Sequence, residues 1–94
     1  MTARPRRRTF SALLRRIEGK GGWHYVTVPP DLMPRDAGPW GRLPVRAWLD
    51  DLAWDTSLWR TRQGDGFLPI PKRIRGSRVE GMTLRVAFEP VEDD

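Results

Sequence analysis

Side chains capable of catalysis are few in this chain, and they form no familiar arrangement. His24 is the only histidine, and the chain has no cysteine. A lone histidine without cysteine or an ordered Ser–His–Asp set provides neither a metal site nor an activated nucleophile. The serines also lie outside any nucleophile-elbow pattern. We therefore predict no catalytic residue, no cofactor and no metal ion, and hence a protein that is not an enzyme.

Two further patterns suggest chemistry but are better explained as turns. Asp50, Asp51 and Asp55 offer carboxylate oxygens, the ligands that hard cations prefer. Aspartate is also common in turns, where its side chain bonds the backbone, and we favour that interpretation. The segment Gly19-Lys20-Gly21-Gly22 lacks the strand–loop–helix setting and the Lys-Ser/Thr ending of a phosphate loop. It predicts a hairpin turn.

The charge of the chain favours a polyanionic partner. Seventeen basic residues against twelve acidic ones give a formal net charge of +5. Clusters of basic residues can neutralise the phosphates of nucleic acids, although an arginine-rich chain also has solvated basic surface of no special role. The candidate nucleic-acid-binding residues are Arg6, Arg7, Arg8, Lys72, Arg73, Arg75 and Arg78.

Aromatic residues provide a second candidate site. If alternating residues such as Val26 and Val28 face the core, their neighbours face the other way. These neighbours could form a groove for a small molecule or a peptide, unless the aromatic rings are used for packing within the barrel. The candidate ligand-binding residues are Trp23, Tyr25 and Phe67, rimmed by Arg46 and Arg60.

The elements that must position these residues are short strands separated by glycine and proline. Alternation of apolar and polar residues predicts six strands, at residues 10–17, 23–28, 43–49, 52–59, 66–70 and 82–89. Short helical turns are expected after Pro30 and over residues 72–77. Only Asp50 and Asp51 separate two of the strands, which predicts a two-residue hairpin with positive φ at Asp51. We expect a disordered basic arm at 1–8, one β-barrel domain at 9–90 and an acidic tail at 91–94.

The chain also contains an internal repeat. The run from Tyr25 to Leu32 recurs as the run from Phe67 to Ile74, each with a short apolar strand, a proline and a helical step. A Gly-rich turn precedes each copy and an alternating strand follows it. The strand from Phe10 matches the strand from Trp54 in its pattern. Two such units predict a mainly β fold, a six-stranded barrel with pseudo-two-fold symmetry.

Several segments together resemble a known bacterial family. They are Gly21-Gly22-Trp23-x-Tyr25-Val26, Gly41-Arg42-Leu43-Pro44-Val45, Trp54-x-Thr56-Ser57-Leu58, Pro71-Lys72-x-Ile74-Arg75 and Gly81-x-x-Leu84-x-Val86. In order and spacing they resemble the family called domain of unknown function 1905. The resemblance implies a double-split β-barrel, similar to the barrels that AbrB-type regulators and MazE-type antitoxins build from two chains. Here one chain would supply both halves, so a monomer with a pseudo-dimeric barrel is expected.

We expect a small non-enzymatic binding module of uncharacterised role. Nucleic acid is the partner most compatible with the charge, and another protein is the other possibility. The alternative is a small-molecule or peptide site in the aromatic groove, with or without an enzymatic activity. No apolar run is long enough to span a bilayer and no targeting segment is evident, so no membrane partner and a cytoplasmic location are expected.

Overall fold

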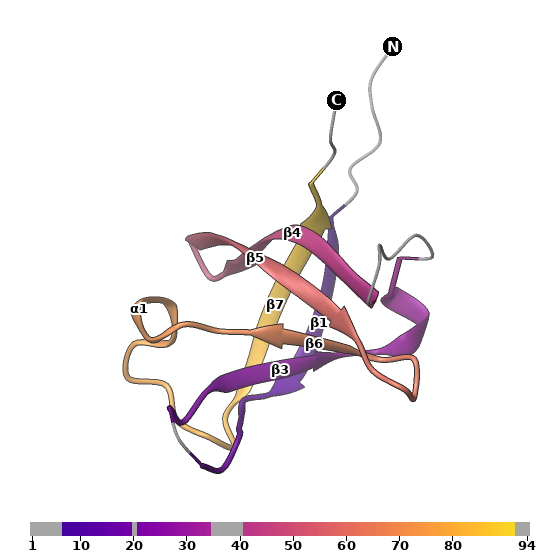
Figure 1. Cartoon of the computed structure of the whole chain (residues 1–94). Helices are drawn as coiled ribbons and strands as arrows, with labels where there is room; N and C mark the ends of the chain where they lie inside the picture. The colour runs from indigo at the N-terminus through magenta and orange to yellow at the C-terminus, as the bar shows by residue number, and fades with distance from the viewer. Residues whose placement is uncertain (1–6, 20, 35–40, 92–94) are drawn as a thin grey trace.

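A computed structural model describes residues 7–19, 21–34 and 41–91, and these form a nearly closed antiparallel β-barrel (Figure 1). The sheet order is β1-β7-β4-β5-β6-β3-β2. In Figure 1, β1 and β7 lie behind, β4 and β5 above, and β3 and β6 below. The elements are β1 Arg8–Leu13, β2 Arg15–Arg16, β3 His24–Val28, the 3₁₀ turn η1 Pro30–Leu32, β4 Arg42–Leu49, β5 Leu52–Arg60, β6 Gly66–Pro69, α1 Lys72–Arg75 and β7 Thr83–Pro90.

The first strand serves two partners, which corrects the expected strand count from six to seven in the described residues. The predicted strand at 10–17 is divided at Leu14, whose N–H donates to the Met82 carbonyl at 2.8 Å and whose carbonyl accepts from the Gly81 N–H at 2.8 Å. Before Leu14 the chain pairs with β7, and after it the chain pairs with β3. The alternation at 10–17 predicts one strand because it continues through the break.

The barrel interior is filled by the alternating apolar residues that the sequence predicts to face inward. Val26 and Val28 on β3 are completely buried, as are Val45 and Ala47 on β4. The core also includes Phe10, Leu14, Met33, Leu49, Trp54, Leu58, Leu68, Ile70, Ile74, Leu84, Val86 and Phe88. Because alternate residues point to opposite sides of a strand, the residues between these lie on the outside of the barrel.

The strand pairing confirms the internal repeat. Val26 pairs with Leu68, and these are the residues that the repeat makes equivalent. Ala47 pairs with Phe88 in the same way on the opposite side of the barrel. The turns match as well, since Leu32 N–H donates to Pro29 O at 3.0 Å and the second copy has the equivalent bond from Ile74 to Pro71 at 2.9 Å.

One detail of the predicted repeat is wrong. Val86 pairs with Phe10, whereas Val45, which is equivalent to Val86, pairs with Thr56. Phe10 therefore corresponds to Thr56 rather than to Trp54. The two-residue offset arises at the break between β1 and β2, because the equivalence holds again beyond it.

The hairpin between β4 and β5 has the predicted length but a different conformation. Leu49 pairs with Leu52, which leaves Asp50 and Asp51 as the two turn residues. The positive φ of 55° is at Asp50, not at Asp51 as predicted. A positive φ at the first central position is typical of a type II′ turn. The Asp50 carboxylate also accepts a hydrogen bond from Arg78, which holds this residue against the segment after α1.

The two helical turns close the barrel rather than extend from it. Ile74 of α1 and Met33, which follows η1, are both buried in the core. α1 ends at Arg75 with Gly76 as its C-cap, within the range that the sequence predicts. No helix in the described parts of the chain is long and apolar enough to cross a membrane.

Candidate functional site

Three aromatic side chains form a row across the outside of the barrel, hereafter the aromatic row: Tyr25 on β3, Phe67 on β6 and Trp59 on β5. Trp59 pairs directly with Phe67 across the two strands. Tyr25 is the diagonal neighbour of Phe67, and their rings stack with centroids 4.5 Å apart at an angle of 29°. Trp59 is 40% exposed. Tyr25 and Phe67 are half-buried, so the row consists of one stacked pair, which was predicted, and one exposed ring on the neighbouring strand.

An arginine follows the aromatic row at each end. Arg15 on β2 pairs with Tyr25, and Arg42 on β4 pairs with Trp59. The guanidinium carbon of Arg42 lies 5.7 Å from the centroid of the Trp59 ring, within the range of a cation–π contact. Arg42 Nε also donates to Ser57 Oγ at 2.9 Å. Both arginines are exposed, so the row has a positive charge at both ends.

Trp59, Arg15 and Arg42 were missed from the sequence, although a signal for their orientation exists. Leu58 is inward in the alternation of its strand, so its neighbour Trp59 must be outward. The alternation cannot show which residue of another strand lies beside Trp59. That depends on pairing between strands far apart in the sequence.

Trp23, another predicted residue, lies just before β3 and is 59% exposed. Its carbonyl accepts a hydrogen bond from the Ile17 N–H at 2.8 Å, which fixes the backbone at the start of the strand. Trp23 alternates with His24, so it faces the same side of the strand as Tyr25. It therefore extends the apolar outer surface of β3 toward the end of the barrel where the hairpin 17–23 turns.

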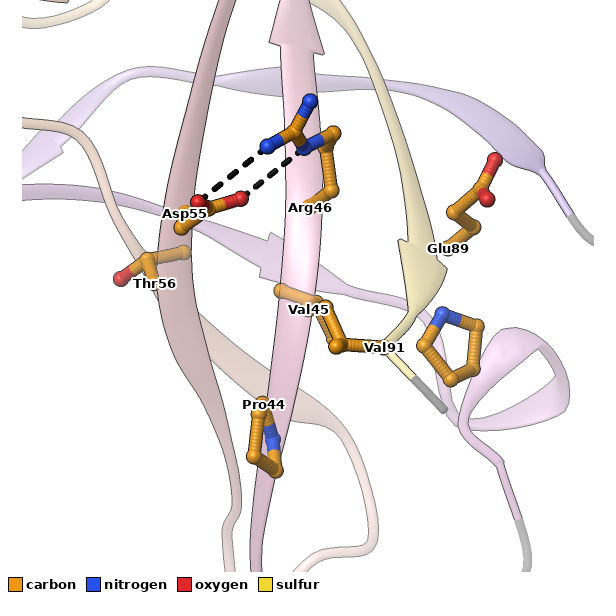
Figure 2. Close-up of a pocket in the computed structure, with 8 residues that line it drawn as sticks. Pro44, Val45, Arg46, Asp55, Thr56, Glu89 and Val91 are labelled. Carbon is orange, nitrogen blue, oxygen red and sulfur yellow. Dashed lines mark hydrogen bonds and ion pairs between the residues drawn. The ribbon is translucent and has the colours of Figure 1, made fainter. Parts of the chain in front are cut away.

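The structure places the two predicted rim arginines away from the aromatic row. Arg46 on β4 binds Asp55 through Nε and Nη2, at 2.9 and 3.2 Å (Figure 2). These hydrogen bonds, and then the charge of Asp55, raise the pKa of Arg46 above its ordinary value. Arg46 and Asp55 line an open depression of about 540 Å³ with Glu89. Arg60 instead donates to the Pro34 carbonyl and secures the chain after η1.

The basic residues near the N-terminus are partly engaged by the barrel. Arg6 lies outside the described residues. The Arg7 guanidinium carbon lies 3.7 Å from the centroid of the Trp48 ring, and Arg7 Nε is 3.9 Å from Glu89 Oε1. Arg8 begins β1 and is half-buried. Arg7 thus contributes to the outer surface around β7 and β4 rather than to the aromatic row. Arg8 shares the inward face of β1 with Phe10, and its Nη1 is buried without a hydrogen-bond partner in the described residues, so it is not free to bind a phosphate.

The cluster at α1 divides into bound and exposed members. Arg78 donates to the carbonyls of Ile74 and Arg75 and to the Asp50 carboxylate. Arg75 donates to the Arg78 carbonyl at 3.3 Å. Arg78 thus caps the last carbonyls of the helix, which lack helical partners, while Arg75 binds the segment that follows the helix. Only the remaining two members, Lys72 and Arg73, are exposed.

The polar residues that the sequence interprets as structural have structural partners. Asp50 pairs with Arg78 and Asp55 with Arg46, so two of the three aspartates of this segment form ion pairs with arginines, and Asp51 is the exposed second residue of the turn. His24 is half-buried on β3, and its carbonyl accepts from the Ile70 N–H at 2.9 Å. Within residues 7–19, 21–34 and 41–91, no three side chains of the metal-binding types gather into a group that could hold an ion.

Comparison with known proteins identifies the family of the chain. No curated protein matches the sequence. The family described as "Domain of unknown function (DUF1905)" matches residues 10–86, which is most of the barrel. The match begins in β1 and ends in β7, so it includes both copies of the internal repeat and the whole aromatic row. The chain therefore belongs to the DUF1905 family.

Proposed function

We propose that the protein is a small non-enzymatic binding module that holds single-stranded nucleic acid across the aromatic row. Exposed aromatic rings stack with nucleobases of any sequence, because every base has a π face. A duplex hides these faces within its own base stack, so only an unpaired strand presents them. The observation that carries the proposal is the row itself, with Tyr25 and Phe67 already stacked at 4.5 Å and Trp59 beside them.

The charges around the row support the same partner. Arg15, Tyr25, Phe67, Trp59 and Arg42 lie on five neighbouring strands, which at the usual strand spacing extends about 19 Å along the surface. Arginine binds phosphate bidentately and remains charged at all relevant pH values. A strand lying along the row would place bases on the rings and phosphates near the two arginines.

The predicted basic clusters are weaker candidates for the main contact. Arg75 and Arg78 use their donors on backbone carbonyls, and Arg78 is also paired with Asp50. Lys72 and Arg73 are exposed, but they lie on the four-residue helix α1, whereas the rings of the aromatic row lie on β3, β6 and β5. These residues and Arg7 would add general attraction for polyanions.

Two features bear on the oligomeric state and the location of the module. One chain provides both equivalent halves of the barrel, so we propose that it acts as a monomer. Similarity of this pairing to AbrB-type barrels is an analogy of fold and does not by itself transfer their function. The absence of cysteine suits a reducing compartment such as the cytoplasm, which we propose as its location.

Fluorescence anisotropy with short oligothymidine, oligouridine and a duplex of the same length tests the function. We expect both single strands to bind more tightly than the duplex, and the two single-stranded arms show whether DNA or RNA is preferred. Tyr25→Ser and Phe67→Ser should each weaken binding about 5- to 150-fold, the effect of losing one stacked base. Trp48 is an outward aromatic residue of β4 that lies outside the aromatic row, beside Arg7, so Trp48→Ser is the matched control and should leave the affinity unchanged.

A salt series identifies the phosphate contacts. Arg15→Gln and Arg42→Gln should each lower the slope of log K against log salt by about 0.7. Arg73→Gln, an exposed arginine on α1, should change the slope little. A larger effect of Arg73→Gln would place the interface on the basic cluster instead. Absence of binding to every oligonucleotide would reject the proposal in favour of a small molecule, a peptide or a protein partner.

A further inference from the structure

An open depression adjoins the Tyr25 end of the aromatic row, hereafter the base slot. It is lined by Ala12, Leu13, Arg15, Tyr25, Thr27 and Asp65. Its volume of about 460 Å³ falls within the range of about 300–1,000 Å³ that is typical of ligand sites. Three of its lining residues come from the divided first strand and its link to β2, and the others come from β3 and the turn before β6.

The base slot exists because the barrel is not fully closed at this point. β1 pairs with β7, and β2 pairs with β3 only at Tyr25 and His24. No strand in the described residues pairs with Thr27 on the side facing β1. The break at Leu14 therefore leaves a gap between β1 and β3 on the outer surface, and Leu13, which is 47% exposed, forms its far wall.

The walls of the base slot suit a flat ring. Phe67 covers one face of Tyr25 in the stacked pair but does not line the slot. The face of Tyr25 that Phe67 leaves free is the one that a ring in the slot could contact, and Leu13 adds an apolar side chain to the lining. A planar group entering here would extend the stack of Tyr25 and Phe67 by one ring. Offset stacking of this kind is favourable for aromatic groups.

The polar groups of the base slot are of opposite charge. Arg15 is exposed at the mouth and can bind a phosphate. Asp65 is half-buried, and its Oδ1 accepts a hydrogen bond from the Thr61 hydroxyl. The Thr61 N–H also donates to the Asp65 carbonyl at 2.8 Å, so the turn 61–65 fixes the position of this carboxylate. A carboxylate accepts hydrogen bonds but donates none.

From this arrangement we propose that the base slot takes one nucleobase with an exocyclic amino group, and so selects cytosine, adenine or guanine over thymine and uracil, which have none. The inference rests on the proposed function and adds a sequence preference to it. The base lies on Tyr25, its phosphate is bound by Arg15, and its amino group donates to Asp65. A carboxylate that accepts from the N4 amino group of cytosine is a known form of base recognition. Thymine and uracil present a carbonyl at that position, which the carboxylate repels.

Competition anisotropy with oligothymidine and an alternating thymidine–cytidine strand of equal length tests the inference at neutral pH. The wild-type protein should bind the mixed strand about tenfold more tightly, the effect of one hydrogen bond to a charged group. Asp65→Asn should remove this preference, because an amide donates as well as accepts and so suits either pyrimidine. Asp55→Asn changes an exposed aspartate of β5 that pairs with Arg46 and does not line the slot, so this variant should keep the preference. A circular dichroism melt of each variant shows that it is folded.

The outcomes separate the two proposals. If neither strand binds, the proposed function is wrong. If oligothymidine binds but the mixed strand binds equally, or if Asp65→Asn retains the preference, base selection by the slot is wrong while the proposed function stands. A preference that is lost in Asp65→Asn and retained in Asp55→Asn supports the inference.

Discussion

Gly66 is the residue at which the barrel has the least room. A Cβ there would lie 2.8 Å from Leu58 Cδ1 and closer still to Met33 Sδ. Real side chains do not approach so closely, so a larger residue would force Leu58 and Met33 to shift. The backbone of Gly66 does not have positive φ, and its conformation would be open to other residues. Glycine at this position is therefore explained by the close packing of the Leu58 and Met33 side chains.

Replacement of Gly66 by alanine should lower the free energy of unfolding by about 1–3 kcal/mol, because the added methyl group overfills the core. Urea denaturation measures this change. Met33→Ala alone should cost about 2–5 kcal/mol, because it leaves a cavity beside Gly66. In the double variant the new methyl group occupies part of that cavity, so the total loss should be less than the sum. An additive result would contradict direct contact between the two positions.

At the residue scale, the sequence predicts which side of its strand a side chain faces better than it predicts which side chain lies beside it on the next strand. The alternation at Tyr25 and Phe67 correctly places both rings outside the barrel. It cannot predict that Trp59 lies beside Phe67, or that Arg46 instead faces Asp55. A side chain's direction is set by its own strand, whereas its cross-strand neighbour depends on register.

Among the elements, the β4–β5 hairpin has the sharpest difference between expectation and structure. Either Asp50 or Asp51 could supply the positive φ that a two-residue turn requires. The structure assigns it to Asp50, which also receives the hydrogen bond from Arg78. This bond joins the hairpin to the segment after α1, which is distant in sequence. Turn preferences alone do not include such a contact.

The turn assignment predicts different effects of glycine at the two positions. Asp50→Gly should relieve the positive φ, whereas Asp51→Gly should only add freedom to the unfolded chain, at a cost of about 0.5–1 kcal/mol. Both are best compared in an Arg78→Gln background, so that the ion pair to Asp50 is absent from each. We expect the higher urea midpoint for the Asp50→Gly variant. The reverse order would place the positive φ at Asp51.

At the scale of the whole molecule, the repeat predicts more than any single element does. A two-fold relation requires equivalent strands to pair with each other, as β3 does with β6 and β4 with β7. The sequence therefore predicts the mainly β barrel and its symmetry. It does not predict the break at Leu14, because the residues on both sides continue the same alternation. The break occurs because one segment pairs with two different strands, β7 before Leu14 and β3 after it.

The start of β1 lies beside the end of β7, since Arg8 pairs with Phe88. The two halves are equivalent and these two strand ends lie close together, so the barrel should form whichever half comes first along the polypeptide. A circular permutant that begins at Asp51, ends at Asp50 and joins Asp94 to Met1 would present the same succession of units as the natural chain. It should fold cooperatively with an unchanged far-ultraviolet circular dichroism spectrum, because permutation is best tolerated at exposed turns. An unfolded permutant would mean that the covalent β4–β5 connection, and not the symmetry, organises the barrel.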